Sequence, residues 1–179
     1  MTRISLVRHG QTSWNAERRL VGWTDVPLDD VGEQQAAYLG AAIEISRYQE
    51  VWTSDLQRAA ATARLAGWDA RPDRRLREIN FGELEGSTWD SIAPELREGL
   101  VAFEGFTPPG GESTSSLVAR ITEFLDERED GPHLLVTHGG VIRAVLRLCG
   151  ESGAFPGHGQ VYTIDWSRRI LTDVQTPTV

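Results

Sequence analysis

Hydrophobic and polar positions along the chain alternate between a strand-like and a helix-like pattern. "RISLV" (3–7) and "HLLVTH" (133–138) are short apolar runs, and the second is nearly continuous, as in a strand covered on both faces. "GEQQAAYLGAAIE" (32–44) and "ESTSSLVARITEFLDERE" (112–129) instead place their apolar residues on one helical stripe. The succession of strands and helices predicts an α/β fold with a mostly parallel sheet and helices on both faces.

Local signals place further elements. "EVWTS" (50–54) predicts a short strand, and an alanine-rich helix follows it and is closed by Gly67. We expect a helix over 139–150. The runs 160–166 and 168–175 are predicted to form a terminal hairpin.

Helix starts and one irregular segment complete the outline. Asp29 or Asp30 is expected to begin the helix of 32–44, and Ser113 is expected to cap the helix of 112–129. Residues 69–111 have no sustained period and contain four prolines, so we expect an irregular segment with short helices near Trp89 and Leu96.

The composition bounds the class of protein. The length of 179 residues is ordinary for one domain, taken as 1–179, and allows a real core. Cys149 is the only cysteine, which excludes an internal disulfide, and its apolar surroundings favour an inert thiol. No apolar run is long enough to span a bilayer, and the first residues lack a signal-peptide pattern. We therefore expect a cytoplasmic protein.

The net charge is −8, from 18 basic and 26 acidic residues. An acidic surface argues against nucleic acid and against anionic membranes as partners. Basic residues gathered at one place in such a protein would form a local positive site.

Two of the predicted strands end in histidine followed by glycine. These are His9 in "SLVRHGQ" and His138 in "LLVTHGG". Because ligands bind at the carboxyl ends of strands in open α/β sheets, we expect both imidazoles at one crevice if the strands are neighbours. Arg8 beside His9 favours an anion over a metal cation, and Arg58 follows a third strand. Phosphate suits such arginines because guanidinium binds it in a bidentate fork.

These motifs also occur together in one known family. "LVRHGQTSWN" resembles the signature of the histidine phosphatase superfamily, the phosphoglycerate mutase-like proteins. "RLVGWTDVPLDDVGEQQA", "VWTSDLQRAAATA", "LREINFGELEG", "PGGES" and "LLVTHGGVIR" are similar to further family segments in the family's order. The resemblance covers nearly the whole chain. It implies a three-layer sandwich with a short lid insertion around 79–112.

The resemblance implies roles for individual residues. His9 would be the nucleophile that forms a phosphohistidine, and Arg8, Arg58 and His138 would bind the non-bridging oxygens. Glu78 would act as general acid and then as general base. The other candidate phosphate- or substrate-binding residues are Asn15, Gln11, Thr12, Gly22 and Gly139. Family members use no metal for this chemistry, and no cofactor is expected.

Several residues have a second interpretation. Glu83 is the substitute acid if Glu78 is not the family's acidic residue. Arg58 could instead pair with Asp55 on its own helix. His158 could line the pocket mouth, although a solvated loop histidine is the favoured interpretation. His133 is expected at the surface. Arg74, Arg75 and Arg77 are expected to form a solvated basic run, although they could alternatively hold a second charge of the substrate.

The six tryptophans are expected mainly in the core or at subunit contacts, with Trp89 facing the substrate. Asn80 stands where many relatives have histidine, which bears on substrate contacts.

Three functions are compatible with the residues. The favoured one is a metal-independent phosphatase acting on a small phosphorylated metabolite, similar to the α-ribazole phosphatase and broad-specificity branch. A cofactor-dependent phosphoglycerate mutase is the second, although the segment 86–111 is short and Arg97 is its only basic residue. A non-catalytic phosphoryl-binding relative is the third. The substrate stays open between α-ribazole phosphate, a phosphosugar, a phosphoglycerate derivative and the varied esters of a broad acid phosphatase. A homodimer is possible.

Overall fold

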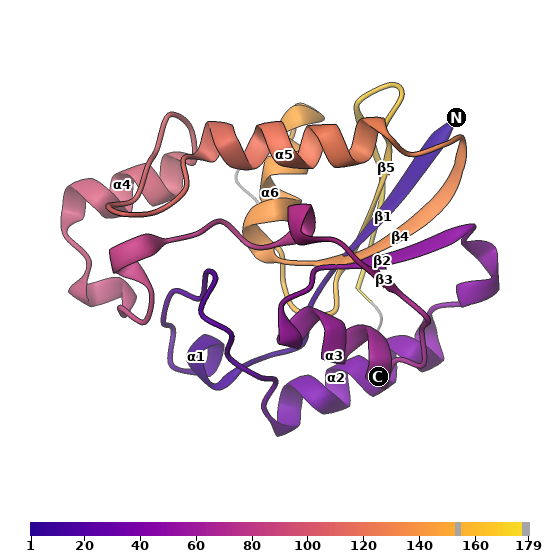
Figure 1. Cartoon of the computed structure of the whole chain (residues 1–179), viewed down its shortest axis with the longest axis horizontal. Coiled ribbons are helices and arrows are strands. Elements are labelled where there is room, and N and C mark those ends of the chain that lie inside the picture. The colour runs from indigo at the N-terminus through magenta and orange to yellow at the C-terminus, as the bar shows by residue number, and fades with distance from the viewer. Residues whose placement is uncertain (153–154, 177–179) are drawn as a thin grey trace.

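A six-stranded sheet lies between two layers of helices in the computed structural model, which describes residues 1–152 and 155–176 (Figure 1). The strand order is β3–β2–β4–β1–β5–β6. Strands β1 to β4 run parallel, and β5 runs antiparallel to both β1 and β6. The bounds are β1 Thr2–Arg8, β2 Glu50–Thr53, β3 Arg71–Pro72, β4 Gly131–Thr137, β5 Val161–Asp165 and β6 Ile170–Gln175. The mostly parallel sheet and the terminal hairpin are confirmed.

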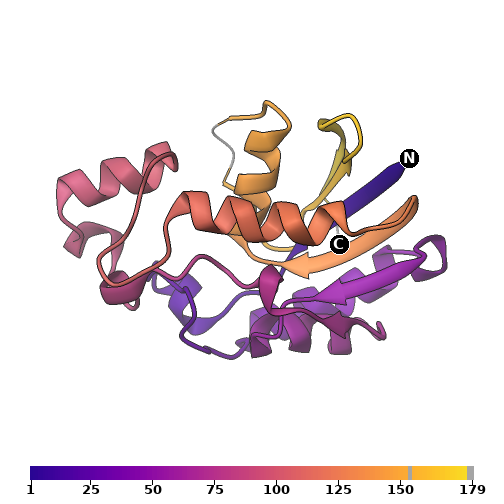
Figure 2. The same cartoon turned by 45° about the horizontal axis from the view of Figure 1, so that its top comes forward.

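Four helices cover the two faces of the sheet, as two views 45° apart agree (Figures 1 and 2). Helices α2 (Asp30–Ala42) and α3 (Gln57–Leu65) pack together on one face. Helices α5 (Thr114–Asp126) and α6 (Gly139–Leu148) pack together on the other. The arrangement is the expected three-layer sandwich.

The alternation of side chains along β1 joins the three layers. Ile4 and Leu6 are fully buried in the cluster that contains the apolar residues of α5 and α6. Val7 points to the other face and packs with Leu39 of α2 and Ala59 of α3. Because both faces of this central strand are covered, its sequence is almost continuously apolar.

Side-chain caps begin two of the helices where the sequence places them. The Asp29 carboxylate accepts from the main-chain N–H of Gly32 at 2.8 Å at the start of α2. The Ser113 hydroxyl accepts from the N–H of Ser116 at 3.0 Å at the start of α5. Each bond satisfies one of the donors that the first helical turn leaves free.

The irregular segment after β3 lies beyond the carboxyl ends of the parallel strands (Figure 1). Its longest element is α4 (Pro94–Ala102), which with the 3₁₀ turn at Trp89 matches the expected short helices. Phe103 and Phe106 anchor the segment in the same core as α5. The short elements are α1 Ser13–Ala16, η1 Ile45–Arg47, η2 Arg74–Leu76, η3 Gly82–Leu84 and η4 Trp89–Ser91.

His133 is buried, which corrects the expectation of an exposed residue. It lies in β4 between β1 and β2, opposite Ile4 and Glu50. Its side chain has no exposed surface, and its Nε2 lies 2.9 Å from the main-chain oxygen of Glu129. Because β4 has a neighbouring strand on each side, the side chain of His133 is covered, although Gly131 and Pro132 before it are only partly buried.

Trp68 and Trp166 are buried, whereas Trp89 is 37 % exposed. Cys149 is partly buried at the end of α6, and burial raises the pKa of its thiol. No helix among the described residues combines the length and the apolar character needed to cross a membrane.

Candidate active site

His9 and His138 face each other at the ends of two neighbouring parallel strands. The main-chain N–H of His9 donates to the carbonyl of Thr137 at 2.9 Å, which continues the pairing of β1 with β4. The centroids of the two imidazole rings lie 5.0 Å apart, and both side chains are buried. The expectation that the two strand-end histidines share one crevice is confirmed.

The hydrogen bonds of His9 define its tautomer. Nδ1 lies 2.6 Å from the carbonyl oxygen of Gly10 and must carry the proton, because a carbonyl oxygen only accepts. Nε2 accepts from Nε of Arg58 at 3.3 Å and therefore has a lone pair. Burial, with Arg58 and Arg8 nearby, lowers the pKa of His9 well below its usual range. The ring is neutral near pH 7, as a nitrogen nucleophile must be.

Arg58 is fully buried and fixed by the loop that follows α1. Its guanidinium donates to the carbonyl of Gly22 at 2.7 Å and to that of Thr24 at 3.2 Å. Burial lowers the pKa of Arg58 to about 10, so the group is cationic at neutral pH. The alternative partner Asp55 binds Arg77 instead, at 2.7 Å. Arg58 is thus positioned against His9.

Several buried polar atoms near His9 have no partner within residues 1–152 and 155–176. They are Nε of Arg8, which is a donor, and the two ring nitrogens of His138, of which one carries the proton in the neutral ring. The other end of the Arg8 guanidinium donates to the carbonyl of Pro156 at 2.7 Å. Because buried polar groups in folded proteins almost always have partners, this cluster points to a bound polar ligand.

Glu78 lies against the first turn of α6. Its carboxylate accepts from the N–H of Gly140 at 3.0 Å and from the N–H of Ile79 at 2.9 Å. Burial raises the pKa of Glu78, while these two bonds and the nearby Arg58 and Arg8 oppose the rise. The competing candidate Glu83 is exposed. Of the two carboxylates, Glu78 has the environment of a general acid.

Of the other predicted phosphate-binding residues, Asn15 and Gly139 line the pocket, whereas Gln11, Thr12 and Gly22 are not among its lining residues. Asn15 lines the pocket, and its Oδ1 accepts from the hydroxyl of Thr12 at 2.9 Å in the capping box of α1, which leaves its amide N–H₂ free of that bond. Gly139 also lines the pocket beside Arg8. Gln11 donates to Asp29 at 3.1 Å, so its side chain is bound to the start of α2.

Thr12 and Gly22 contact other residues of the site and hold them in place. Thr12 is fully buried as the N-cap of α1. Gly22 gives its carbonyl to Arg58, and a Cβ there would collide with the carboxylate of Glu85.

The basic run before Glu78 is bound in ion pairs. Arg75 pairs with Asp73 and Glu127, each at 2.8 Å, and Arg77 pairs with Asp55. The expectation of a solvated run fits only Arg74, which is exposed.

Arg120 on α5 is a supporting residue that sequence reasoning missed. Its guanidinium donates to the carbonyl of Glu78 at 2.9 Å and to that of Arg75 at 2.6 Å, and it pairs with Glu112 at 2.7 Å. Arg120 lies beside the apolar stripe of α5, between Leu117 and Ile121, and a charged residue at such a position indicates a buried polar contact.

His158 lies against His9, which corrects the favoured interpretation of a solvated loop residue. Its Nδ1 lies 2.7 Å from the main-chain oxygen of His9, and the two ring centroids are 5.5 Å apart. The antiparallel pairing of β5 with β1 brings the loop before β5 to the end of β1.

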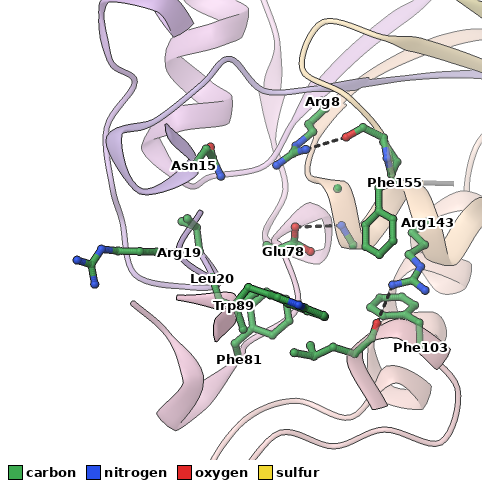
Figure 3. A pocket seen from close by; sticks show the side chains of 15 residues that line it. Arg8, Asn15, Arg19, Leu20, Glu78, Phe81, Trp89, Phe103, Arg143 and Phe155 are labelled. Carbon is green, nitrogen blue, oxygen red and sulfur yellow. Dashed lines mark hydrogen bonds between the residues drawn. The ribbon is translucent and has the colours of Figure 1, made fainter. Parts of the chain in front are cut away.

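A cavity of about 180 Å³ opens beside these residues (Figure 3). At one end lie Arg8, Asn15 and Glu78, which Figure 3 shows converging on one space. Trp89 and Arg143 line the cavity farther from these three residues. Arg143, like Arg120, was not predicted from the sequence. Within the described part of the chain, no three His, Cys, Asp or Glu side chains are grouped as a metal site requires.

Comparison with known proteins gives related sequences over most of the chain. "Phosphoglycerate mutase-like protein 4" of Arabidopsis thaliana is 36% identical over 83% of this chain and 71% of its own. "Probable phosphoglycerate mutase GpmB" of Yersinia enterocolitica is 36% identical over 82% and 74%. The crystal structure of TTHB049 from Thermus thermophilus is 46% identical, with a TM-score of 0.89 over 97% of this chain and 98% of that one. Residues 4–167 match the histidine phosphatase superfamily (branch 1), and the chain belongs to this family.

Proposed function

We propose that the protein is a metal-independent phosphomonoesterase that acts on a small phosphorylated metabolite through a phosphohistidine on His9. The observation that carries this proposal is the neutral His9, with its Nε2 lone pair beside Arg58 and opposite His138. Phosphoryl transfer needs positioning and charge stabilisation above all, and this cluster supplies both.

In the first step, Nε2 of His9 attacks phosphorus opposite the ester oxygen. The Nε2–P bond forms as the P–O ester bond breaks, and Glu78 gives its proton to the leaving alkoxide. Arg8, Arg58 and the ring N–H of His138 hold the three non-bridging oxygens. The unpartnered buried donors of Arg8 and His138 support this assignment.

In the second step, water attacks the phosphohistidine. Glu78, now a carboxylate, takes a proton from the water as the Nε2–P bond breaks, which releases phosphate and restores the starting enzyme. The burial that raises the pKa of Glu78 supports its dual role, because the group must exist in both protonation states near the working pH.

The names of the relatives favour a second candidate, a phosphoglycerate mutase. A mutase would return the phosphoryl group from His9 to a second hydroxyl of the substrate, rather than to water. It would also need cations to hold the substrate carboxylate. The one basic residue of 86–111, Arg97, is not among the side chains that line the cavity within the described part of the chain. Arg19 and Arg143 do line it, and each donates to a main-chain carbonyl, Gly86 and Leu100 respectively.

The test measures phosphate release from 4-nitrophenyl phosphate between pH 4.5 and 7.5 with a chelator present. Wild type should release phosphate, and His9→Ala should not. Quench of a single turnover in alkaline denaturant, where a phosphohistidine is stable, followed by mass spectrometry, should find the phosphoryl group on the peptide that contains His9.

Interconversion of phosphoglycerates without net phosphate release would favour the mutase. Phosphate binding without either reaction would favour the non-catalytic relative. Lasting loss of activity in the chelator would reject the metal-independent mechanism.

A further inference from the structure

The loop 22–25 carries the main-chain oxygens that orient Arg58. The guanidinium donates to the carbonyls of Gly22, at 2.7 Å, and Thr24, at 3.2 Å. Its Nε lies 3.3 Å from Nε2 of His9. The direction in which the guanidinium faces the reacting nitrogen therefore depends on where this short loop lies.

The loop also contacts the start of α3, the helix that carries Arg58. Leu56, the N-cap residue of α3, has no side-chain hydrogen bond to the helix. Instead, the carboxylate of Asp25 accepts from the main-chain N–H of Gln57 at 2.8 Å, and the Gln57 side chain donates to the main-chain oxygen of Asp25. Both the backbone and the guanidinium of Arg58 are thus tied to the loop.

The carboxylate of Glu85 holds the loop in turn. Oε1 accepts from the N–H of Trp23 at 2.8 Å, and Oε2 accepts from the N–H of Thr24 at 2.7 Å and from the Thr24 hydroxyl. Oε1 also accepts from the N–H of Phe81 at 3.2 Å. A carboxylate has about four acceptor positions, so these bonds leave none over for a substrate. Glu85 is also not among the described residues that line the cavity.

The charge of Glu85 and its close fit to the loop both strengthen this contact. A Cβ at Gly22 would collide with the Glu85 carboxylate, so the backbone of the loop lies directly against it. Hydrogen bonds to an ionised acceptor are roughly twice as strong as those between neutral groups. Burial lowers the pKa of Arg58 to about 10, and nearby carboxylates, Glu85 among them, oppose that shift.

Trp23 connects the same loop to Glu78, which offers a second route to the reaction. Its Nε1 donates to the main-chain oxygen of Glu78 at 2.8 Å. The Glu78 carboxylate itself is bound by the N–H groups of Gly140 and Ile79, outside the loop. The functional side chain that the loop holds directly is therefore that of Arg58.

We propose that Glu85 is a positioning residue: it holds the loop 22–25, and the loop sets the Arg58 guanidinium where it binds a non-bridging oxygen of the phosphoryl group. This inference rests on the proposed phosphatase function and adds to it a residue outside the cavity. Glu85 acts through Arg58 and does not itself bind the substrate.

The test measures kcat/KM of wild type and Glu85→Gln on two esters. 4-Nitrophenyl phosphate releases nitrophenolate, which leaves without a proton, whereas 2-phenylethyl phosphate releases an alkoxide that needs one. Both esters present the same non-bridging oxygens to Arg58, so kcat/KM should fall about tenfold for each. A much larger loss on 2-phenylethyl phosphate would show that Glu85 acts through Glu78, and would overturn the inference.

A double-mutant cycle with Arg58→Ala tests the route directly. In that background Glu85→Gln should lower kcat/KM less than about twofold, because the group that Glu85 positions is gone. Calorimetric binding of orthovanadate makes the same comparison without turnover and should show the same pattern. Equal losses in the two backgrounds would indicate a general structural role and would overturn the inference.

Glu83→Gln is the matched control, because it removes the same charge from an exposed side chain of the same segment. It should leave both the rates and the binding of orthovanadate near those of wild type. Thr24→Val removes only the hydroxyl donor and should lower kcat/KM roughly two- to threefold. It takes the place of Glu85→Gln in the cycle if circular dichroism shows that Glu85→Gln does not fold.

Wild-type release of phosphate with undiminished activity of Glu85→Gln would overturn this inference alone. Absence of phosphate release by wild type from both esters would instead reject the proposed function. The orthovanadate cycle would then still decide whether Glu85 positions Arg58.

Discussion

His158 donates a hydrogen bond from Nδ1 to the main-chain oxygen of His9 at 2.7 Å, across 149 positions of the sequence. The same loop accepts a bond at Pro156 from the guanidinium of Arg8, also at 2.7 Å. Arg8 and His9, the two residues at the end of β1, are therefore both hydrogen-bonded to the segment that precedes β5. His158 also meets the His9 ring at an interplanar angle of 62°.

Replacement of His158 should slow catalysis more than it weakens binding. His158→Ala removes the donor that holds the His9 backbone, and small displacements of a reacting group are costly. We expect kcat to fall about tenfold with less than a threefold change in KM, measured by steady-state phosphate release. His158→Asn, which keeps an N–H donor, should recover part of kcat. Full activity of His158→Ala would exclude a positioning role.

Acidification below neutral pH should destabilise the folded protein. Burial, with Arg8 beside the ring, lowers the pKa of His158 from 6.5 to about 4, and His9 and His138 shift in the same direction. Between pH 6.5 and 4 the unfolded chain therefore binds more protons at these sites than the folded protein does. The unfolding free energy consequently decreases as the pH is lowered through this range. The raised pKa of Glu78 acts in the opposite sense, but it is one group against three.

Urea unfolding at pH 7.5, 6.0 and 5.0 measures this effect. At about 1.4 kcal/mol per pKa unit, the contribution of His158 has a ceiling of about 3.5 kcal/mol. His158→Asn should flatten the dependence on pH relative to wild type. A wild-type unfolding free energy that stays constant down to pH 5 would contradict the assignment of neutral buried histidines.

The predictable part of the site comes from residues next to strand ends. His9 and His138 could be placed together because parallel strands bring their carboxyl ends to one edge, whichever helices connect them. His158 could not, since its position depends on the antiparallel register of β5 with β1, which no local signal reports. His133 was misplaced because its burial depends on a neighbour on each side of β4.

Glu78→Gln should affect substrates according to their leaving group. Loss of general acid catalysis costs roughly 10²- to 10⁴-fold, so turnover of 2-phenylethyl phosphate should fall by this factor. The first step with 4-nitrophenyl phosphate should fall much less, because nitrophenolate leaves without a proton. The phosphohistidine should then accumulate, since the base for the attacking water is missing, and samples quenched in alkaline denaturant would reveal it.

Glu83→Gln is the matched control, because Glu83 is an exposed carboxylate in the same segment. It should stay within about twofold of wild type on both substrates. A loss in Glu83→Gln equal to that in Glu78→Gln would reassign the acid.

Arg120→Ala should reduce both stability and activity. It removes the donors to the carbonyls of Glu78 and Arg75 and leaves the carboxylate of Glu112 partly buried without its partner. The expected loss is about 2–3 kcal/mol in the free energy of unfolding. Arg71→Ala, which breaks the more exposed ion pair with Glu50, should cost less than about 1 kcal/mol in the same urea titration. Equal losses in the two variants would show that Arg120 is not a support of the Glu78 segment.

Gly140→Ala should separate activity from stability. A Cβ at this position would collide with the Glu78 carboxylate, so the carboxylate must move off the Gly140 N–H. That bond favours the charged form and lowers the pKa of Glu78, so its loss should raise this pKa and carry the alkaline limb of the kcat/KM profile to higher pH. Alanine is favoured over glycine in a helix by up to about 1 kcal/mol, so the variant should remain folded. Lower activity with an unmoved pH profile would mean that Glu78 is not the group whose protonation governs the reaction.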